Sequence, residues 1–181
     1  MKDLPDEKLM ELVKFGKLNF MELLFTRYQK PVYNYFLKCT LDQEESRDLT
    51  QNTFIRVMKY RSSFRADHGF RVWLFQIARN LVKDHFRKTA VYRNQHTSLD
   101  NIPDPEGEGI DGEQMEREEK LHRALGLLPA DKRELLIMGK FQGMKYEEIA
   151  RIRDTSVGAV KVQMHRTIAE LRKIYFEDLQ G

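Results

Sequence analysis

Apolar residues recur at intervals of three and four positions along most of this chain, which is the period of a helix with one buried face. No segment shows the strict alternation of apolar and polar residues that is typical of a half-buried strand. The pattern therefore predicts an all-α protein. We expect helices at residues 6–15 and 19–28, from Pro31 to a break at Asp42, at 44–60, 70–88, 113–127 and 130–141, and two shorter ones within 144–175.

Breaks in the pattern indicate how the chain is divided. Pro31 suits the first turn of a helix, so we expect separate helices before and after it. Residues 61–69 show no sustained period and are predicted to form a loop. Between residues 89 and 111 the pattern gives way to proline, glycine and acidic residues, which is typical of a linker. The predicted organisation is two small helical domains, residues 1–92 and 119–181, joined by an acidic linker at 93–118.

The last two helices form the clearest local motif. The apolar positions of the first are Tyr146, Ile149 and Ala150, and those of the second are Val157, Val160, Met164, Ile168 and Leu171. Asp154 and Thr155 fall at the turn between them. Ser156 is a good N-cap for the second helix, because its hydroxyl can accept a hydrogen bond from a backbone amide of the first turn. This pattern predicts a helix-turn-helix, with a plain helical hairpin as the alternative.

The polar face of the second helix favours the helix-turn-helix. Its residues outside the apolar stripe are Gly158, Ala159, Lys161, Val162, Gln163, His165 and Arg166. In a helix-turn-helix this face enters the major groove of DNA. Glutamine can pair with N6 and N7 of adenine, while lysine and arginine suit guanine or phosphate. Gly158 and Ala159 are small enough to let the start of the helix approach a surface closely.

The net charge of +3 hides an uneven distribution. Residues 100–119 hold nine acidic residues and one basic residue, so the rest of the chain carries a charge of +11. Within the N-terminal part, residues 56–93 hold ten basic and two acidic residues, with aromatic residues among them. A run of charge is often only a solvated face, but basic residues mixed with aromatic ones favour contact with a polyanion.

Other features exclude whole classes of function. The single cysteine, Cys39, can form no internal disulfide and is expected to be a small buried residue. No group of cysteine and histidine residues has the spacing of metal ligands, and no glycine-rich phosphate loop is present, so we expect neither a metal nor a cofactor. No apolar run approaches the length of a membrane span, and residues 1–11 are too charged for a signal peptide. These observations predict a cytoplasmic protein that is not inserted in the membrane.

Three stretches together resemble one family, the bacterial extracytoplasmic-function (ECF) sigma factors of the sigma-70 class. Residues 48–54, DLTQNTF, are similar to the family's DLxQxxF segment. Residues 70–88 are similar to its FRTWLxxIARNxxxDxxRK run. Leu128 and Pro129, with YEEIA at 146–150 and SVGAVK at 156–161, are similar to its C-terminal domain. The resemblance covers most of the chain and has fewer matches in residues 1–41.

The resemblance implies a function and partners. It implies a sigma factor, which makes no covalent chemistry and lends promoter specificity to core RNA polymerase. The implied partners are promoter DNA, the polymerase through its beta-prime clamp helices and beta flap, and an anti-sigma factor. By the same resemblance the loop at 61–69 receives an extruded base, and the acidic linker threads basic channels of the polymerase.

The resemblance also assigns residues to three surfaces. The polymerase-binding set is Asp48, Leu49, Gln51, Asn52 and Phe54. The set for the minus-ten promoter element is Phe64, Arg71, Arg79, Asn80, Lys83, Arg87 and Lys88, in which aromatic or guanidinium faces would stack on bases and cations would neutralise phosphate. The set for the minus-thirty-five element is Ser156, Ala159, Lys161, Val162, Gln163 and Arg166. For Trp73 and Phe70, which lie within the same run, core packing is the competing role.

The recognition helix departs from the family pattern. Where the family often has Thr-Val-Lys-Ser-Arg, this chain has AVKVQ at residues 159–163, so a hydroxyl and a cation are missing from the DNA face. The turn reads Arg-Asp-Thr at 153–155 in place of an apolar-glycine-apolar sequence. Two other classes of function remain as alternatives. A nuclease would need clustered carboxylates and a metal, and a stand-alone helix-turn-helix regulator would have no use for the segment at 48–54.

Overall fold

The computed structural model describes residues 3–93 and 112–178, and in these two ranges every regular element is helical. The N-terminal half contains α1 (Asp6–Lys14), η1 (Leu18–Phe20), α2 (Met21–Thr40), α3 (Gln43–Lys59), η2 (Arg61–Ser63), η3 (Ala66–His68) and α4 (Phe70–Arg93). The C-terminal half contains α5 (Gly112–Leu127), α6 (Ala130–Leu136), η4 (Ile137–Phe141), α7 (Tyr146–Arg153), α8 (Val157–Lys173) and η5 (Ile174–Asp178). The predicted all-α fold is confirmed.

The region around Pro31 differs from the prediction. One continuous helix, α2, takes the place of the two expected helices, with Pro31 inside it. Its buried residues, among them Leu24, Val32 and Phe36, lie on both sides of the proline. Burial of one long apolar face therefore outweighs the backbone hydrogen bond that the proline cannot donate. The carbonyl of Pro31 accepts a hydrogen bond from the side chain of Gln142, 3.0 Å away, in the C-terminal half.

Side-chain caps set where α3 and α8 begin. The carboxylate of Asp42 accepts from the amide of Glu45 at 2.9 Å and begins α3. The hydroxyl of Ser156 accepts from the amide of Ala159 at 3.1 Å and begins α8, as predicted. Each bond satisfies a backbone donor that the first turn of a helix leaves without a partner.

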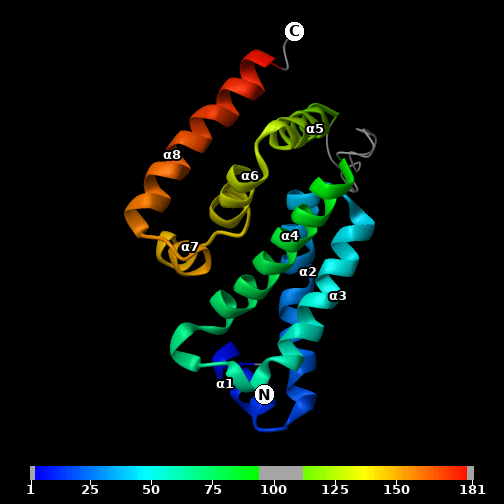
Figure 1. Cartoon of the computed structure of the whole chain (residues 1–181), viewed down its shortest axis with the longest axis vertical. Coiled ribbons are helices and arrows are strands. Elements are labelled where there is room, and N and C mark those ends of the chain that lie inside the picture. The colour runs from blue at the N-terminus through cyan, green and yellow to red at the C-terminus, as the bar shows by residue number, and fades with distance from the viewer. Residues whose placement is uncertain (1–2, 94–111, 179–181) are drawn as a thin grey trace.

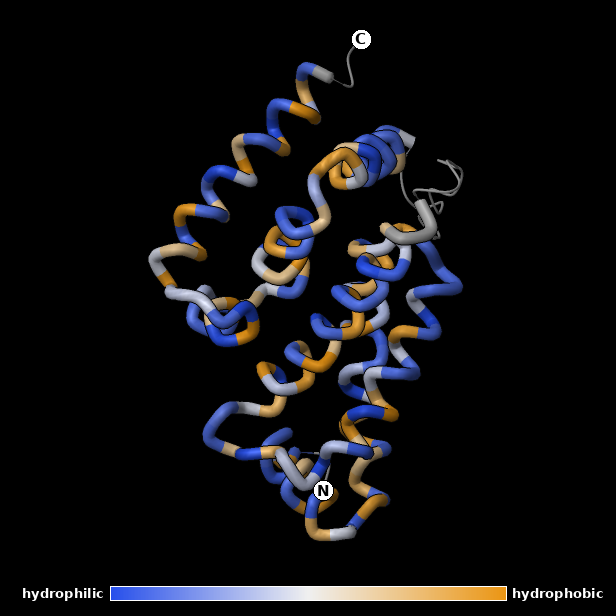
Figure 2. Tube along the Cα trace, viewed as in Figure 1, coloured by the Kyte–Doolittle hydropathy of each residue, from blue (hydrophilic) through white to orange (hydrophobic). Residues whose placement is uncertain are grey.

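The helices pack as amphipathic elements around buried side chains. Figure 2 shows hydrophobic and hydrophilic residues interspersed along the helices, as amphipathic helices require. In the N-terminal half, α2 contacts α3, and α3 contacts α4. An aromatic group of Tyr35, Phe36 and Phe75 fills the space between α2 and α4, with ring centroids 5.3 and 5.4 Å from that of Tyr35. Cys39 is buried, as expected, and burial raises the pKa of its thiol.

The two halves lie against each other. In Figure 1, α6 and α7 lie beside α4, on the side away from α3, and α8 is outermost. The contacts agree with this arrangement, because α4 packs on α7, α2 packs on α6 and η4, and α8 packs on α6 and α7. The predicted linker is largely outside the described residues, and its last seven residues belong to α5. The division into domains at 92 and 119 remains a prediction. No helix in the described ranges is long and apolar enough to cross a membrane.

Candidate nucleic-acid interface

The turn between α7 and α8 has the geometry of a helix-turn-helix. Asp154 ends α7 in the left-handed backbone region, with φ of 52°. The amide of Thr155 then donates to the carbonyl of Ala150 at 3.0 Å, which satisfies a carbonyl at the end of α7. Aspartate tolerates this conformation better than most residues, so the chain can turn here without glycine. The departure from the family pattern at Asp154 therefore leaves a tight turn in place.

One face of α8 packs on the rest of the C-terminal half. Val160, Met164 and Thr167 are buried on it. At Gly139 in η4, a β-carbon would lie 2.5 Å from the methyl group of Met164. A side chain at this position would have to displace the flexible end of Met164, so glycine lets Met164 pack closely on η4.

The opposite face of α8 is open to solvent. Lys161, Gln163 and Arg166 are exposed, Ala159 is partly exposed, and Val162 keeps half of its surface accessible although it is apolar. The exposed face starts directly after the Ser156 cap, in the part of a recognition helix that contacts base edges. All six residues predicted for the minus-thirty-five element thus lie on one accessible surface or at its start.

The loop at 61–69 is held between α1 and α4. It consists of two short turns, η2 and η3, and its Phe64 is buried at 1% exposure. The Phe64 ring meets those of Trp73 and Phe70 edge-on, with centroids 5.3 and 6.2 Å away. Phe64 therefore packs in the core here and is not presented to a base. Trp73 and Phe70 also take the packing role.

Two polar contacts from α1 secure this loop. Lys14 donates to the carbonyl of Phe64 at 2.7 Å. Glu7 accepts from the amide of Phe70 at 3.0 Å and so caps the start of α4. Neither contact was predicted from the sequence, because the partners lie 50 and 63 positions apart.

The polar residues predicted on α4 fall into two groups. Asn80, Lys83, Arg87 and Lys88 are exposed, and Arg87 is paired with Asp84 at 3.1 Å on the same helix. Arg71 and Arg79 instead contact the C-terminal half. Arg71 donates to the carbonyl of Gln142, and Arg79 lies 3.2 Å from Glu134. The first group lies together on an accessible surface, whereas the second group is held in contacts with the C-terminal half.

The residues predicted to bind polymerase, all on α3, also divide by burial. Asp48, Gln51 and Asn52 are exposed, whereas Leu49 and Phe54 are buried. The ring of Phe54 meets that of Phe25 edge-on at 4.8 Å, so it holds α3 against α2. A groove runs between α3 and α4 beside the exposed residues. It is lined by Glu45, Asp48, Leu49, Asn52, Ile55, Arg56, Lys59, Tyr60, Leu81, Asp84, His85 and Lys88.

A buried ionic cluster joins the two halves, and sequence reasoning missed it. Glu134 on α6 accepts hydrogen bonds from the Tyr35 hydroxyl at 2.8 Å, from Arg79 at 3.2 Å and from Arg153 at 2.9 Å. Arg153 also pairs with Asp131 at 2.8 Å. Burial, with Cys39 and Glu134 nearby, raises the pKa of Tyr35. The sequence held one signal of this cluster, because Glu134 is an acid directly before the apolar run LLIM. The helix that contains it has little exposed surface.

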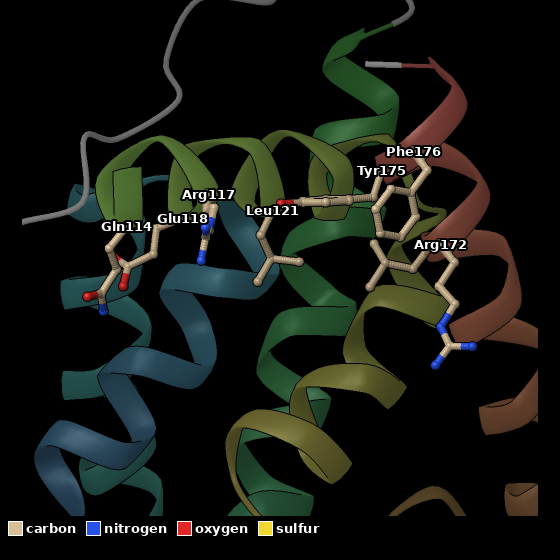
Figure 3. A pocket seen from close by; sticks show the side chains of 8 residues that line it. Gln114, Arg117, Glu118, Leu121, Arg172, Tyr175 and Phe176 are labelled. Carbon is tan, nitrogen blue, oxygen red and sulfur yellow. The ribbon is translucent and has the colours of Figure 1, made fainter. Parts of the chain in front are cut away.

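A second hollow lies between α5 and the C-terminal end of α8. Figure 3 shows its side chains coming from α5, from the end of α8 and from η5, with Leu121 next to Tyr175 of η5. Its other lining residues are Gln114, Arg117, Glu118, Leu171 and Arg172. The ammonium group of Lys120 lies 4.6 Å from the centre of the Tyr175 ring. None of the residues predicted for polymerase or DNA lines this hollow.

These features define the class of protein. A folded helix-turn-helix presents an open polar face, and a separate helical half carries a basic helix and an exposed polar segment on α3. Among the described residues, no group of histidine, cysteine, aspartate and glutamate side chains is arranged to hold a metal ion. The architecture is that of an all-helical, two-part transcription factor.

Comparison with known proteins identifies the family. Sigma-70 region 2 matches residues 24–91, and Sigma-70, region 4 matches residues 118–171. The RNA polymerase sigma-H factor of Pseudomonas aeruginosa is 27% identical over 175 residues, covering 89% of each chain. The ECF RNA polymerase sigma-E factor of Haemophilus influenzae is 28% identical over 176 residues, covering 90% of this chain and 91% of that one.

A solved structure shares the fold. The sigma factor RpoE of Bartonella quintana, determined in complex with the anti-sigma factor NepR, superposes with a TM-score of 0.70. It is 22% identical, and the match covers 87% of this chain and 98% of that one.

The two matching sigma-70 regions occur in the family's order and together take in about two thirds of the chain. This protein belongs to the sigma-70 family and is an ECF sigma factor, a transcription initiation factor of bacterial RNA polymerase.

Proposed function

We propose that this sigma factor divides promoter recognition between its two halves. The α8 face, from Ala159 to Arg166, reads the minus-thirty-five element. The exposed residues of α4 act on the minus-ten element, and the α3 face around Asp48 binds core polymerase. The observation that carries the proposal is that the α3 and α8 faces are both exposed and polar, yet lie on separate elements. One chain can therefore hold polymerase and duplex DNA at the same time.

The domain boundaries and residue roles are part of this proposal. We assign residues 1–92 to polymerase binding and minus-ten recognition, 93–118 to the linker, and 119–181 to minus-thirty-five recognition. Leu49 and Phe54 support the polymerase surface from beneath, because both are buried. The protein makes no covalent chemistry of its own, and it acts by lowering the free energy of the polymerase bound at particular sequences.

In vitro transcription with core polymerase over a promoter library tests the proposal. The chain should select a defined set of promoters, and the double variant Asp48→Ala, Gln51→Ala should lose association with core enzyme in a pull-down. Gln29→Ala, an exposed change on α2, is the matched control and should bind normally. Unchanged affinity of the double variant would contradict the role of α3. Tight, sequence-specific binding to duplex DNA without any polymerase-dependent transcription would favour a stand-alone regulator.

We further propose that an anti-sigma factor holds this protein inactive. The similar sigma factor of Bartonella quintana was solved with such a partner, which supports the assignment by family relationship. A tagged chain should co-purify with one partner from the native bacterium. That partner, added in pure form to the transcription reaction, should abolish promoter-dependent transcripts. Transcription that continues at saturating partner would contradict inhibition.

A further inference from the structure

An apolar side chain lies in the middle of the exposed face of α8. Val162, in the second turn of the helix, keeps 50% of its surface accessible. On an α-helix, the surface neighbours of a residue are those three and four positions away. For Val162 these are Gly158 and Ala159 on one side and His165 and Arg166 on the other. Val162 therefore has no large apolar neighbour on this face.

The turn that precedes Val162 is unusually bare. Side chains on a helix point back toward its N-terminus, so the valine methyl groups lie over the turn that holds Gly158 and Ala159. A β-carbon at Gly158 would meet only the hydroxyl oxygen of Ser156, 4.0 Å away, so the space beside this glycine is open. Ala159 adds a single methyl group. The methyl groups of Val162 are therefore accessible to a molecule that approaches the start of α8.

Neither helix formation nor packing explains a valine at this position. Its β-branched side chain makes it a weaker helix former than alanine, lysine or glutamine. Half of its surface is in water, so it gains little from burial in the folded chain. The same branching holds the side chain largely in one rotamer on a helix, so little side-chain freedom is lost when it meets a partner. Val162 is therefore a rigid apolar contact that suits binding better than stability.

The polar residues around Val162 indicate what the partner is. Within the part of the chain that the structure describes, the side chains of Lys161, Gln163 and Arg166 make no hydrogen bond or ion pair. Cations of this kind hold phosphate, and glutamine pairs with a base edge. The face therefore combines one apolar contact with uncommitted groups for DNA. The apolar feature that base pairs present in the major groove is the 5-methyl group of thymine.

We propose that Val162 reads the 5-methyl group of a thymine in the minus-thirty-five element. The inference rests on the proposed function, because that function places α8 in the major groove. The family often has serine at this position, which offers a hydroxyl group to a base. Valine replaces that hydrogen bond with an apolar contact, and thymine alone among the four bases carries a methyl group in this groove. The substitution therefore sets a thymine preference that is particular to this chain.

Replacing thymine by deoxyuridine tests the contact, because deoxyuridine lacks only the 5-methyl group. The protein is the holoenzyme assembled from the full chain and core polymerase, and the probe is a promoter duplex that the library selects. Each thymine of its minus-thirty-five element is replaced in turn, and affinity is measured by equilibrium competition. The variants are Val162→Ala and Val162→Ser. Leu127→Ala is the control, because Leu127 is an apolar residue of α5 that is 60% exposed away from this face.

We expect the unmodified holoenzyme to lose about fourfold in affinity at one thymine, the effect of one methyl group that is no longer buried. Val162→Ala and Val162→Ser should bind thymine and deoxyuridine equally at that position, and Leu127→Ala should keep the fourfold difference. Each protein is compared with itself, so an effect of the substitution on folding cancels.

The outcomes separate this inference from the function on which it rests. The thymine contact is overturned if the selected minus-thirty-five element contains no thymine, or if no deoxyuridine weakens binding by the unmodified holoenzyme. It is also overturned if the same difference persists in Val162→Ala. A holoenzyme that selects no promoters from the library would instead overturn the proposed function.

Discussion

Truncation of Phe64 distinguishes two roles for its ring, base stacking and core packing, because a stacking residue and a core residue respond differently to truncation. Its side chain is 1% exposed and packs on Trp73 and Phe70. Phe64→Ala should therefore leave a cavity and lower the free energy of unfolding by about 3–5 kcal/mol. In a protein of this length, that loss corresponds to a fall in melting temperature of about 6–20 °C.

The assay is thermal unfolding followed by circular dichroism, with Phe15→Ala as the control. Phe15 is 79% exposed in the same half, so its truncation should change stability by no more than about 0.5 kcal/mol. Phe64→Leu should lose less than Phe64→Ala, because it fills most of the cavity. If Phe64→Ala has the same melting temperature as the unmodified protein and impairs only the opening of promoters, the ring stacks on DNA. The packing argument is then refuted.

Three further predictions address the DNA surfaces and the contact between the halves. Gln163→Arg should shift the preferred minus-thirty-five sequence at one or two positions and steepen the salt dependence of binding by about one phosphate contact; identical sequence logos from a randomised library would mean that Gln163 faces no base. Asn80→Ala should impair open-complex formation more on duplex promoters than on promoters already mismatched at the minus-ten element, and equal impairment would make Asn80 a structural residue. Burial, together with nearby Lys38 and Arg133, lowers the pKa of His122 below its ordinary value of about 6.5, so the stability that its neutral form supports is complete above that pH and is lost as pH falls. Between pH 7.5 and 5, the melting temperature of His122→Leu should fall less than that of the unmodified chain. Equal falls would show that another group titrates.

Local features of the fold could be predicted because they depend on neighbouring residues. The turn at Asp154, the Ser156 cap and the apolar stripe of α8 all follow from the sequence within a few positions of each element. Pro31 shows where such reasoning fails. A proline suits the start of a helix locally, yet α2 continues through it because apolar residues are buried on both sides of the proline.

The sequence predicts which residues of the candidate site are polar, but not which contacts they make in the folded chain. Which residues of α4 are polar follows from the helical period, but that Arg79 is engaged by Glu134 depends on a partner 55 positions away. Phe64 shows the same limit. Its place in a loop next to arginines suggests a base-stacking residue, but its ring is packed in the core. No periodicity connects such distant positions, so only the folded arrangement could reveal these contacts.

The separation along the chain between Tyr35 and Glu134, 99 positions, has a consequence for synthesis on the ribosome. All contacts within the N-terminal half can form once Arg93 has emerged, whereas the donor from Arg153 requires 60 further residues. At about 5–20 residues per second, translation leaves an interval of roughly 3–12 s between the emergence of Arg93 and that of Arg153, during which Glu134 and its donors cannot all be in place. A newly made chain therefore passes through a stage in which α4 is uncovered, and partners that bind during translation meet this surface before the C-terminal half can close over it.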